Sequence, residues 1–365
     1  MYAKKITAVA AMAILLATAC SKIPDSDNSL FGNYDQTAML NNIGNQVLLA
    51  GINRFSASAA SAATAVSAFA SNPADETLTS AQTAWQKLSQ DWAAAAPFNI
   101  GPMNANLISG AVDEWPANRD KIEKSILAQS KATNVGADAK GLKGLEYLLF
   151  DKNGKAAVLA KYAGDNADKR KAFLNSVAQD VAAKAAYLQN AWNTGYLDAF
   201  ATAKGNDVSS SASQMVNAIA FYLDNIKTLK IGNPIGMGIK INDNRPHPDK
   251  IEYAIAEESL STMKANVQAM KTAFDGGAGQ GLDDLLNYVK AQKNGQNLSA
   301  VVDKQFDEAV AKLNAVNPPY GVAVETQTQQ VKDVFNSLKI LISYFKVDVA
   351  NRLGVTITFS DTDGD

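Results

Sequence analysis

Residues 141–150 read Gly-Leu-Lys-Gly-Leu-Glu-Tyr-Leu-Leu-Phe and combine a charged pair, two glycines and a nearly continuous apolar background. Positions three apart share one side of a helix, so Lys143 and Glu146 lie on one face. Gly141 and Gly144 leave another face bare for close approach of a neighbouring backbone. A carboxylate in such apolar surroundings is expected to be partly buried and to need a partner. We therefore expect Lys143 to neutralise Glu146 and the functional site to lie here.

Helical periods dominate on both sides of this stretch, with no sustained two-residue alternation typical of strands. In the first half, helices are expected over residues 34–69, 75–96, 119–129 and 139–150, followed by a long one whose stripe runs from Leu174 to Tyr196. In the second half they are expected over residues 215–229, 251–274, 280–292, 298–315 and 331–349. The pattern predicts an all-α protein of two up-and-down helical-bundle domains packed together, 34–204 and 205–365.

The N-terminus has the features of an export signal. Lys4 and Lys5 precede an apolar run over residues 6–17, and small residues lead into Cys20. This arrangement predicts a lipoprotein signal peptide over residues 1–19, a lipidated Cys20 and a flexible tether over residues 20–33. An ordinary secretion signal is the alternative. Cys20 is the only cysteine, so no internal disulfide can form, and lipidation would consume its thiol.

The charge and composition of the chain indicate which partners and which cellular location to expect. The formal charge is −2, and removal of residues 1–19 would take away two lysines and no acid. A basic stripe with interleaved aromatic residues, typical of nucleic-acid binding, is missing from the sequence. No segment after the signal has 18 consecutive apolar residues, so the lipid is the expected membrane contact. We expect a cell-envelope protein, with the outer membrane preferred because Ser21 follows the lipidated cysteine.

Three segments in the right order resemble the imelysin-like family. Residues 141–150 are similar to its Gly-x-His-x-x-Glu signature, residues 97–102 and 113–116 to its Phe-Arg-Phe-Gly-Pro and Trp-Pro region, and residues 353–365 to its C-terminal end. The resemblance implies two related helical bundles with a site near their junction. It also implies a secreted or envelope-bound bacterial protein linked to iron regulation, iron uptake or peptide cleavage. The signature histidine is Lys143 here, and the arginine is Asn99.

The resemblance also supplies the candidate site. Glu146 occupies the family's acidic position, and Glu258 and Ser259 resemble a Glu-Ser segment that faces the site. The ligand-binding candidates are Lys143, Glu146, Glu258, Ser259, Asn99, Asp113 and Trp115. Each also has an ordinary structural interpretation: an intrahelical ion pair, residues near a helix start, or a core tryptophan. Glu146 is a weak candidate metal ligand, because an ammonium beside it has donors but no lone pair.

Other motifs point to no catalytic residue. His247 is the only histidine and lies between two prolines, whereas zinc hydrolases draw on two or more ligands. A solvated loop histidine is the simpler interpretation. Asp361 to Asp365 suggests a calcium loop, but its glycine comes at the fourth position, so a capped turn is favoured.

The sequence therefore predicts a non-catalytic envelope lipoprotein that binds iron or an iron compound. The ligand site is expected between the two bundles near Glu146, and the partner is expected to be an outer-membrane iron transport system. A metallopeptidase of the imelysin type is one alternative. A cell-surface interaction protein without a small ligand is another.

Overall fold

The computed structural model describes residues 30–359, which are mostly helical. The α-helices of the first half are α1 (Gln36–Asn42), α2 (Ala50–Ser71), α3 (Asp75–Ala95), α4 (Pro102–Ala105), α5 (Ile108–Asp113), α6 (Arg119–Leu127), α7 (Gly141–Leu149), α8 (Lys155–Lys161), α9 (Ala167–Ala191) and α10 (Leu197–Thr202). Those of the second half are α11 (Ser211–Asn225), α12 (Ser259–Asp275), α13 (Leu282–Tyr288), α14 (Leu298–Ala315), α15 (Tyr320–Thr326), α16 (Thr328–Ser343) and α17 (Ala350–Leu353). The expected all-α class is confirmed.

Shorter elements connect or extend these helices. Turns of π-helix are Ile43–Leu49, Trp192–Tyr196, Ile226–Gly232 and Tyr344–Val349, and 3-10 turns are Ala132–Asn134, Ala137–Ala139 and Pro248–Lys250. Within residues 30–359 the only strands are the antiparallel pair β1 (Gln292–Lys293) and β2 (Gln296–Asn297). The π-helical turns join neighbouring helices into long rods, such as residues 36–71 and 328–353. One rod, residues 167–202, is kinked at Thr194 and Gly195, where φ is 145° at the glycine.

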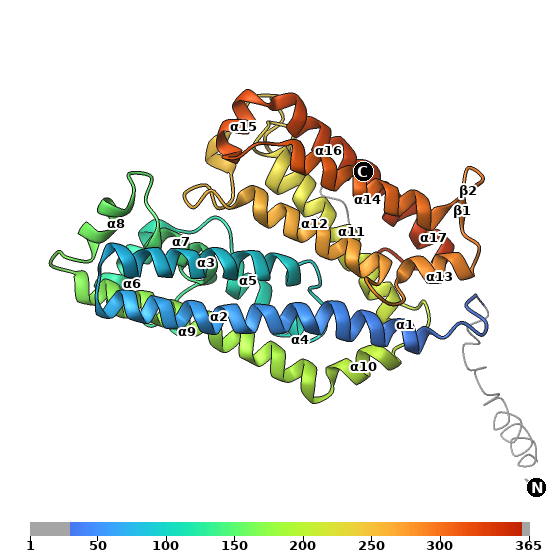
Figure 1. Ribbon diagram of the computed structural model, residues 1–365, viewed down its shortest axis with the longest axis horizontal. Coiled ribbons are helices and arrows are strands. Elements are labelled where there is room, and N and C mark those ends of the chain that lie inside the picture. The colour runs from blue at the N-terminus through green and yellow to red at the C-terminus, as the bar shows by residue number, and fades with distance from the viewer. Residues whose placement is uncertain (1–29, 360–365) are drawn as a thin grey trace, which may run out of the picture.

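The first half is a layer of long helices. Helix α2 packs against both α3 and α9, and α7 packs against α3 and α9 (Figure 1). Along α2, Ile52, Phe55, Ala59, Ala62 and Val66 are buried at steps of three and four, the spacing of one helix face. Small alanines in this stripe let the helices approach closely. Full burial of a large side chain such as Phe55 contributes about 1.5–3 kcal/mol to stability, so this residue stabilises the packing of the layer.

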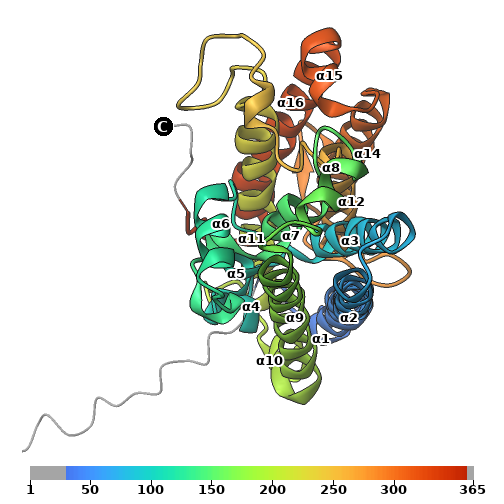
Figure 2. The ribbon, with the colours of Figure 1, turned by 90° about the vertical axis from the view of Figure 1, so that its left-hand side faces the viewer.

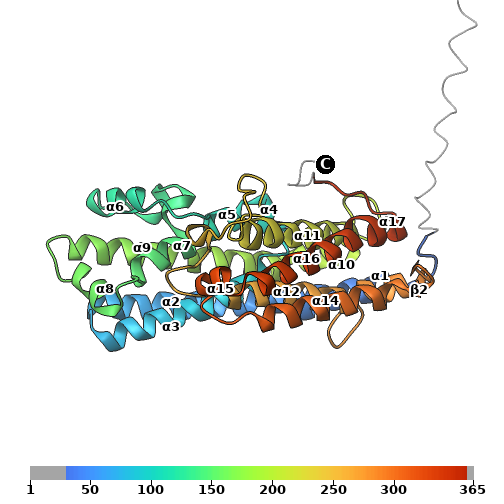
Figure 3. The same ribbon diagram turned by 90° about the horizontal axis from the view of Figure 1, so that it is seen from above.

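The second half packs α14 against α12 and α16, and α11 against α16. Helix α12 also lies along α3, so the two halves share a helix–helix contact beside the candidate site (Figures 1 and 3). The predicted domain boundary at residues 204 and 205 falls in the loop between α10 and α11. Within residues 30–359, none of the helices combines the length and hydropathy that a membrane crossing requires.

The predicted helix over residues 251–274 is wrong in its first third. Helix α12 begins only at Ser259, and residues 251–258 form an irregular loop with left-handed backbone at Tyr253 (φ 52°) and Glu257 (φ 59°). The physical reason is that the carboxylate of Glu146 accepts backbone N–H groups of this segment, which replaces helical hydrogen bonding. Helices α4, α5, α8, α10 and α15 were not expected from the sequence, which predicted residues 97–116 to be irregular.

Several sequence predictions lie outside the described residues. These are the signal peptide over residues 1–19, the lipidated Cys20, the tether as far as residue 29 and the turn from Asp361 to Asp365.

Candidate functional site

Gly141 brings two segments of the first half into contact. Its φ is +67°, and a Cβ at this position would lie 2.3 Å from the carbonyl oxygen of Val112. Only glycine therefore fits at this position, where the end of α5 is in close contact with the start of α7. Gly144 is different, because a Cβ there would meet its nearest atom at an ordinary 3.6 Å. The close approach at Gly141 places Asp113, the last residue of α5, beside Lys143.

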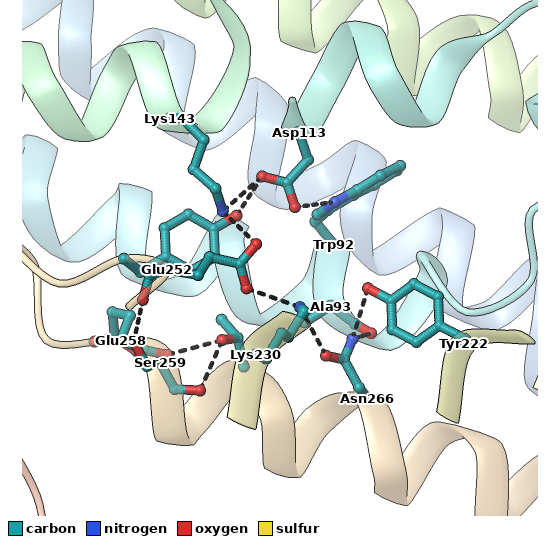
Figure 4. Close-up of polar contacts among 12 residues, drawn as sticks. Trp92, Ala93, Asp113, Lys143, Tyr222, Lys230, Glu252, Glu258, Ser259 and Asn266 are labelled. Carbon is teal, nitrogen blue, oxygen red and sulfur yellow. Dashed lines mark hydrogen bonds and ion pairs between the residues drawn. The ribbon is translucent and has the colours of Figure 1, made fainter. Parts of the chain in front are cut away.

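Lys143 is the centre of the site. Its side chain is 1% exposed, and its Nζ lies 2.9 Å from Asp113 Oδ1 and 2.8 Å from Glu252 Oε1 (Figure 4). The ammonium also lies over the ring of Tyr253, whose hydroxyl donates to Asp113 Oδ1 at 2.6 Å. The second oxygen of Asp113 accepts the indole N–H of Trp92 at 2.9 Å. One cation thus holds two acids that come from opposite halves of the chain.

The predicted ion pair between Lys143 and Glu146 is not formed. Glu146 Oε1 instead accepts the backbone N–H groups of Ile255 and Ala256, each at 3.0 Å. Burial raises the pKa of Glu146, and the opposing effects of the Lys143 charge and the two amides do not cancel it. Glu146 therefore fixes the loop from the second half, while Lys143 reaches past it to Asp113 and Glu252.

Lys230 continues the chain of charges on the far side of Glu252. Its Nζ lies 2.9 Å from Glu252 Oε2 and donates to Asn266 Oδ1 at 3.2 Å. Burial alone would raise the pKa of Glu252, but the ammonium groups of Lys143 and Lys230 hold it well below its usual range. Burial likewise opposes the charged form of Lys230, yet the carboxylate of Glu252 raises the pKa of that lysine. The result is a buried tetrad, Asp113–Lys143–Glu252–Lys230, with two acids and two bases. We call these four residues the charge tetrad.

The remaining predicted residues surround the charge tetrad. The hydroxyl of Ser259 donates to the carbonyl of Glu252. Glu258 accepts from the amide of Gln90 on α3, at 3.2 Å, and from Ser261. Ser259 therefore touches the loop that carries Glu252 (Figure 4), while Glu258 links the two halves through Gln90.

Trp115 and Asn99 lie at pockets next to the tetrad rather than in it. A pocket of about 220 Å³ is lined by Trp115, Leu229 and the polar groups Asp113, Tyr222, Asn225, Lys230 and Glu252. Asn99 lines the adjoining pocket of about 250 Å³, where its Oδ1 accepts from Ser109 at 3.0 Å. The tetrad therefore has a solvent-reachable side formed by Asp113, Glu252 and Lys230.

Sequence reasoning missed Glu252, Tyr253, Lys230, Tyr222 and Asn266. The first two lie in the loop that was expected to be helical, where they appeared as polar positions on a helix. Glu252 is 109 residues from Lys143 in the chain, and no spacing rule connects such distant positions. Asn266 donates to the carbonyl of Ala93 at 2.5 Å and to Tyr222 at 3.3 Å. The one signal in the sequence was a polar residue on the apolar face of the predicted helix, between Met263 and Met270.

The residues of the tetrad do not fit a transition-metal site. Asp113 and Glu252 are the nearest approach to a ligand pair, but the Lys143 ammonium lies between them and would have to leave. Across residues 30–359, no group of three or more His, Cys, Asp and Glu side chains is arranged to hold a metal ion. His247 lies in a separate loop, with its Nε2 2.9 Å from Asp243 Oδ1.

Comparison with known proteins places the chain among relatives of the same fold. The match to iron-regulated protein A of Synechococcus elongatus (strain ATCC 33912 / PCC 7942 / FACHB-805) is 22% identical over 257 residues, covering 68% of this chain and 66% of that protein, just under two thirds of its length. The crystal structure of an iron-regulated protein A precursor from Parabacteroides distasonis ATCC 8503 superimposes with a TM-score of 0.71 at 18% identity, covering 87% of this chain and 95% of that one.

A second solved structure, an imelysin-like protein from Psychrobacter arcticum 273-4, gives a TM-score of 0.69 at 16% identity and covers 89% of this chain and 97% of its own. These structural likenesses establish the helical fold. The imelysin family profile matches residues 48–342, most of the chain. The protein therefore belongs to the imelysin family.

Proposed function

We propose that this protein is a non-catalytic, ligand-binding component of the cell envelope that serves the uptake of iron or an iron compound. One observation carries the proposal: the ammonium of Lys143 lies within 2.9 Å of both Asp113 and Glu252. The cation satisfies these acids internally, while the adjoining pocket leaves one side of the tetrad open to a ligand.

The hydrogen bonding at the tetrad supports binding rather than catalysis. Asp113 accepts from Trp92 and Tyr253, and Glu252 lies between two lysines that lower its pKa. A general base needs a pKa near the working pH and a free lone pair aimed at substrate. Glu146, whose pKa is raised, uses one carboxylate oxygen to hold the loop amides. We assign it to positioning the loop.

The pocket suits a polar, oxygen-rich ligand, because its lining sets the Lys230 ammonium beside two carboxylates, Asp113 and Glu252, that the tetrad already neutralises. Lys230 offers a cation at the wall, and Tyr222 and Asn225 offer a hydroxyl and an amide beside the apolar surfaces of Trp115 and Leu229. A few polar groups set among apolar ones are typical of small-molecule sites. Soluble ferric complexes carry oxygen donors that such groups can recognise. The name of the Synechococcus relative, iron-regulated protein A, supports the link to iron.

Binding measurements test this proposal. Mature protein is titrated by calorimetry with ferric citrate, a ferric hydroxamate siderophore and haem, with tryptophan fluorescence as a second readout because Trp115 lines the pocket. Saturable binding is expected for at least one ligand and should be lost in Lys230→Met. Lys161→Met, which removes a lysine paired with Asp151 elsewhere, is the matched control and should bind normally.

Two outcomes would redirect the assignment. Stoichiometric, tightly held zinc together with peptide cleavage that Glu146→Gln abolishes would make the protein a metallopeptidase. The protein would instead be assigned as a surface interaction protein if it bound no iron compound and its abundance did not change between iron-replete and iron-starved cells. The proposed lipid anchor at Cys20 is tested separately, by palmitate labelling of wild type and Cys20→Ala.

A further inference from the structure

A groove runs beside the charge tetrad along α11. Two pockets of about 250 and 240 Å³ share Asn99, Ala218 and Phe221, so they form one continuous depression. One wall is the segment from Trp92 to Asp113, which includes α4 and α5, and the other is α11. Figures 2 and 3 show α4 and α5 on the same side of the molecule as α11. Thr358 and Phe359, from the segment after α17, line its outer end. The groove therefore combines three segments that are distant in sequence.

The lining of the groove is electrically neutral apart from one carboxylate, which is already paired. Asp113, at the inner end, is the only acidic or basic residue among the described lining residues, and it is already bound by Trp92, Tyr253 and Lys143. Apart from the Trp92 indole, the rest of the polar lining consists of side-chain amides and hydroxyls: Asn99, Asn104, Ser109, Gln214, Asn217, Tyr222, Asn225 and Thr358. A ligand here meets no unpaired charge.

Several of these amides have hydrogen-bonding capacity to spare. The side chains of Asn104 and Asn225 make no hydrogen bond to any other residue in the range 30–359, and Asn99 uses only its oxygen, which accepts from Ser109. Asn217 is different: its nitrogen donates to the carbonyls of Ser213 and Thr356, and its oxygen accepts from Thr358. Of the five side-chain amides, Asn217 therefore holds the wall, Gln214 donates to the carbonyl of Ser209, and the other three can hydrogen-bond to a ligand.

An exposed aromatic ring stands in the middle of these amides. Phe221 lines both pockets, and its side chain is 42% exposed. The ring packs edge-on against Phe359, with centroids 5.4 Å apart, which restrains its position. An aromatic surface flanked by amides suits a ring that presents C–H groups on its face and hydroxyls at its rim. A pyranose sugar has this distribution, and each of its hydroxyls can both donate and accept, as each side-chain amide can.

We propose that this groove binds a neutral oligosaccharide, with a sugar ring on Phe221 and hydroxyls hydrogen-bonded to Asn99, Asn104 and Asn225. Acidic glycans and nucleic acids would find no cation in the lining. A peptide that binds by strand addition needs a sheet edge, and the walls here are helices and loops. Asn225 also lines the pocket of the proposed iron site, but Phe221, Asn99 and Asn104 do not, so variants at these positions test the groove separately.

Calorimetry of the mature protein with a panel of neutral hexaoses tests the proposal, using maltohexaose, cellohexaose, mannohexaose, xylohexaose and chitohexaose in its N-acetylated form. At least one should bind saturably with a Kd of about 1 mM or tighter. Phe221→Ala should weaken that binding roughly tenfold or more, as expected for loss of a central aromatic contact. Asn104→Ala should also weaken it, and cannot disturb internal bonding because this side chain makes none within residues 30–359.

The control variant is Ile340→Ala, which removes an apolar side chain of the same 42% exposure on α16, outside the groove. It should bind the sugar normally. Binding of ferric ligands should be unchanged in Phe221→Ala, which separates this site from the proposed iron site. The inference is overturned if none of the hexaoses binds, if both groove variants bind as wild type does, or if an uncharged Gly-Ser hexapeptide binds in their place.

Discussion

Replacing Lys143 by methionine is the most direct perturbation of this protein. Methionine retains much of the length and apolar stem of lysine but removes the ammonium. Asp113 and Glu252 would then face each other without the cation that lies 2.9 and 2.8 Å from them. Lys230 would still neutralise one oxygen of Glu252, whereas Asp113 would depend on its hydrogen bonds from Trp92 and Tyr253.

The expected cost follows from burial. Removing one member of a buried ion pair leaves an uncompensated charge and costs about 3–5 kcal/mol. Lys143 is 1% exposed at its side chain, so solvent cannot replace the lost partner. Surface pairs contribute far less, about 0–1 kcal/mol. Lys155→Met, which breaks a pair with Asp75 whose two side chains are 40% and 70% exposed, is therefore the matched control.

The pH dependence of this cost has a defined sign. The folded-state pKa of Glu252 lies below its unfolded value, so its stabilising contribution is complete above the unfolded pKa and is lost as the pH falls through the folded pKa. In Lys143→Met one of the two lysines that depress this pKa is gone, so the pKa rises and the contribution shrinks. The gap in stability between wild type and variant should therefore be largest near neutral pH and narrow as the medium is acidified below the unfolded pKa.

Urea unfolding at several pH values, followed by circular dichroism and tryptophan fluorescence, measures this gap. The free energy of unfolding should fall by several kcal/mol in Lys143→Met at neutral pH and by under about 1 kcal/mol in Lys155→Met. Equal, small losses in both variants would refute the idea that Lys143 is the buried counter-ion of Asp113 and Glu252. A gap that widens on acidification would refute the charge argument itself.

Three further predictions concern neighbouring positions. Gly141→Ala should lower the free energy of unfolding by more than about 1 kcal/mol in urea titrations, because the φ of Gly141 is positive and a Cβ would lie 2.3 Å from a backbone carbonyl oxygen. Gly144→Ala, the control, should be neutral or stabilising. Equal losses in the two variants would contradict this account. Glu146→Gln should keep or raise the melting temperature at neutral pH, because the amide oxygen can still accept the loop N–H groups while the buried charge disappears. The pKa of Glu146 is raised in the folded state, so its ionised form lowers the stability of the protein above the unfolded pKa. A large drop in melting temperature would therefore argue against the raised pKa. Tyr253→Phe removes the 2.6 Å bond to Asp113 and should cost about 0.5–3 kcal/mol in the same titration, and no loss at all would mean that the bond is not made in solution.

The helices were predictable because their information is local. Apolar residues at steps of three and four marked the rods at residues 36–71, 75–95 and 328–353, and these lie close to the expected bounds. The resemblance to the imelysin family and the prediction of a functional site at residues 141–150 also came from short stretches of sequence. Periodicity, turn residues and motif spacing all act within a few turns of helix, so one chain suffices to read them.

The partners of Lys143 depend on contacts that no local pattern specifies. Helical spacing favoured Glu146, three residues away, but that carboxylate binds the amides of Ile255 and Ala256. This interaction keeps residues 251–258 out of a helix, although their apolar spacing continued that of α12. The unwound loop then turns Glu252 and Tyr253 toward α7. A buried charge is stabilised by whichever opposite charge the packing of α5, α7 and the loop brings within 3 Å, and that packing exists only after the two halves have met.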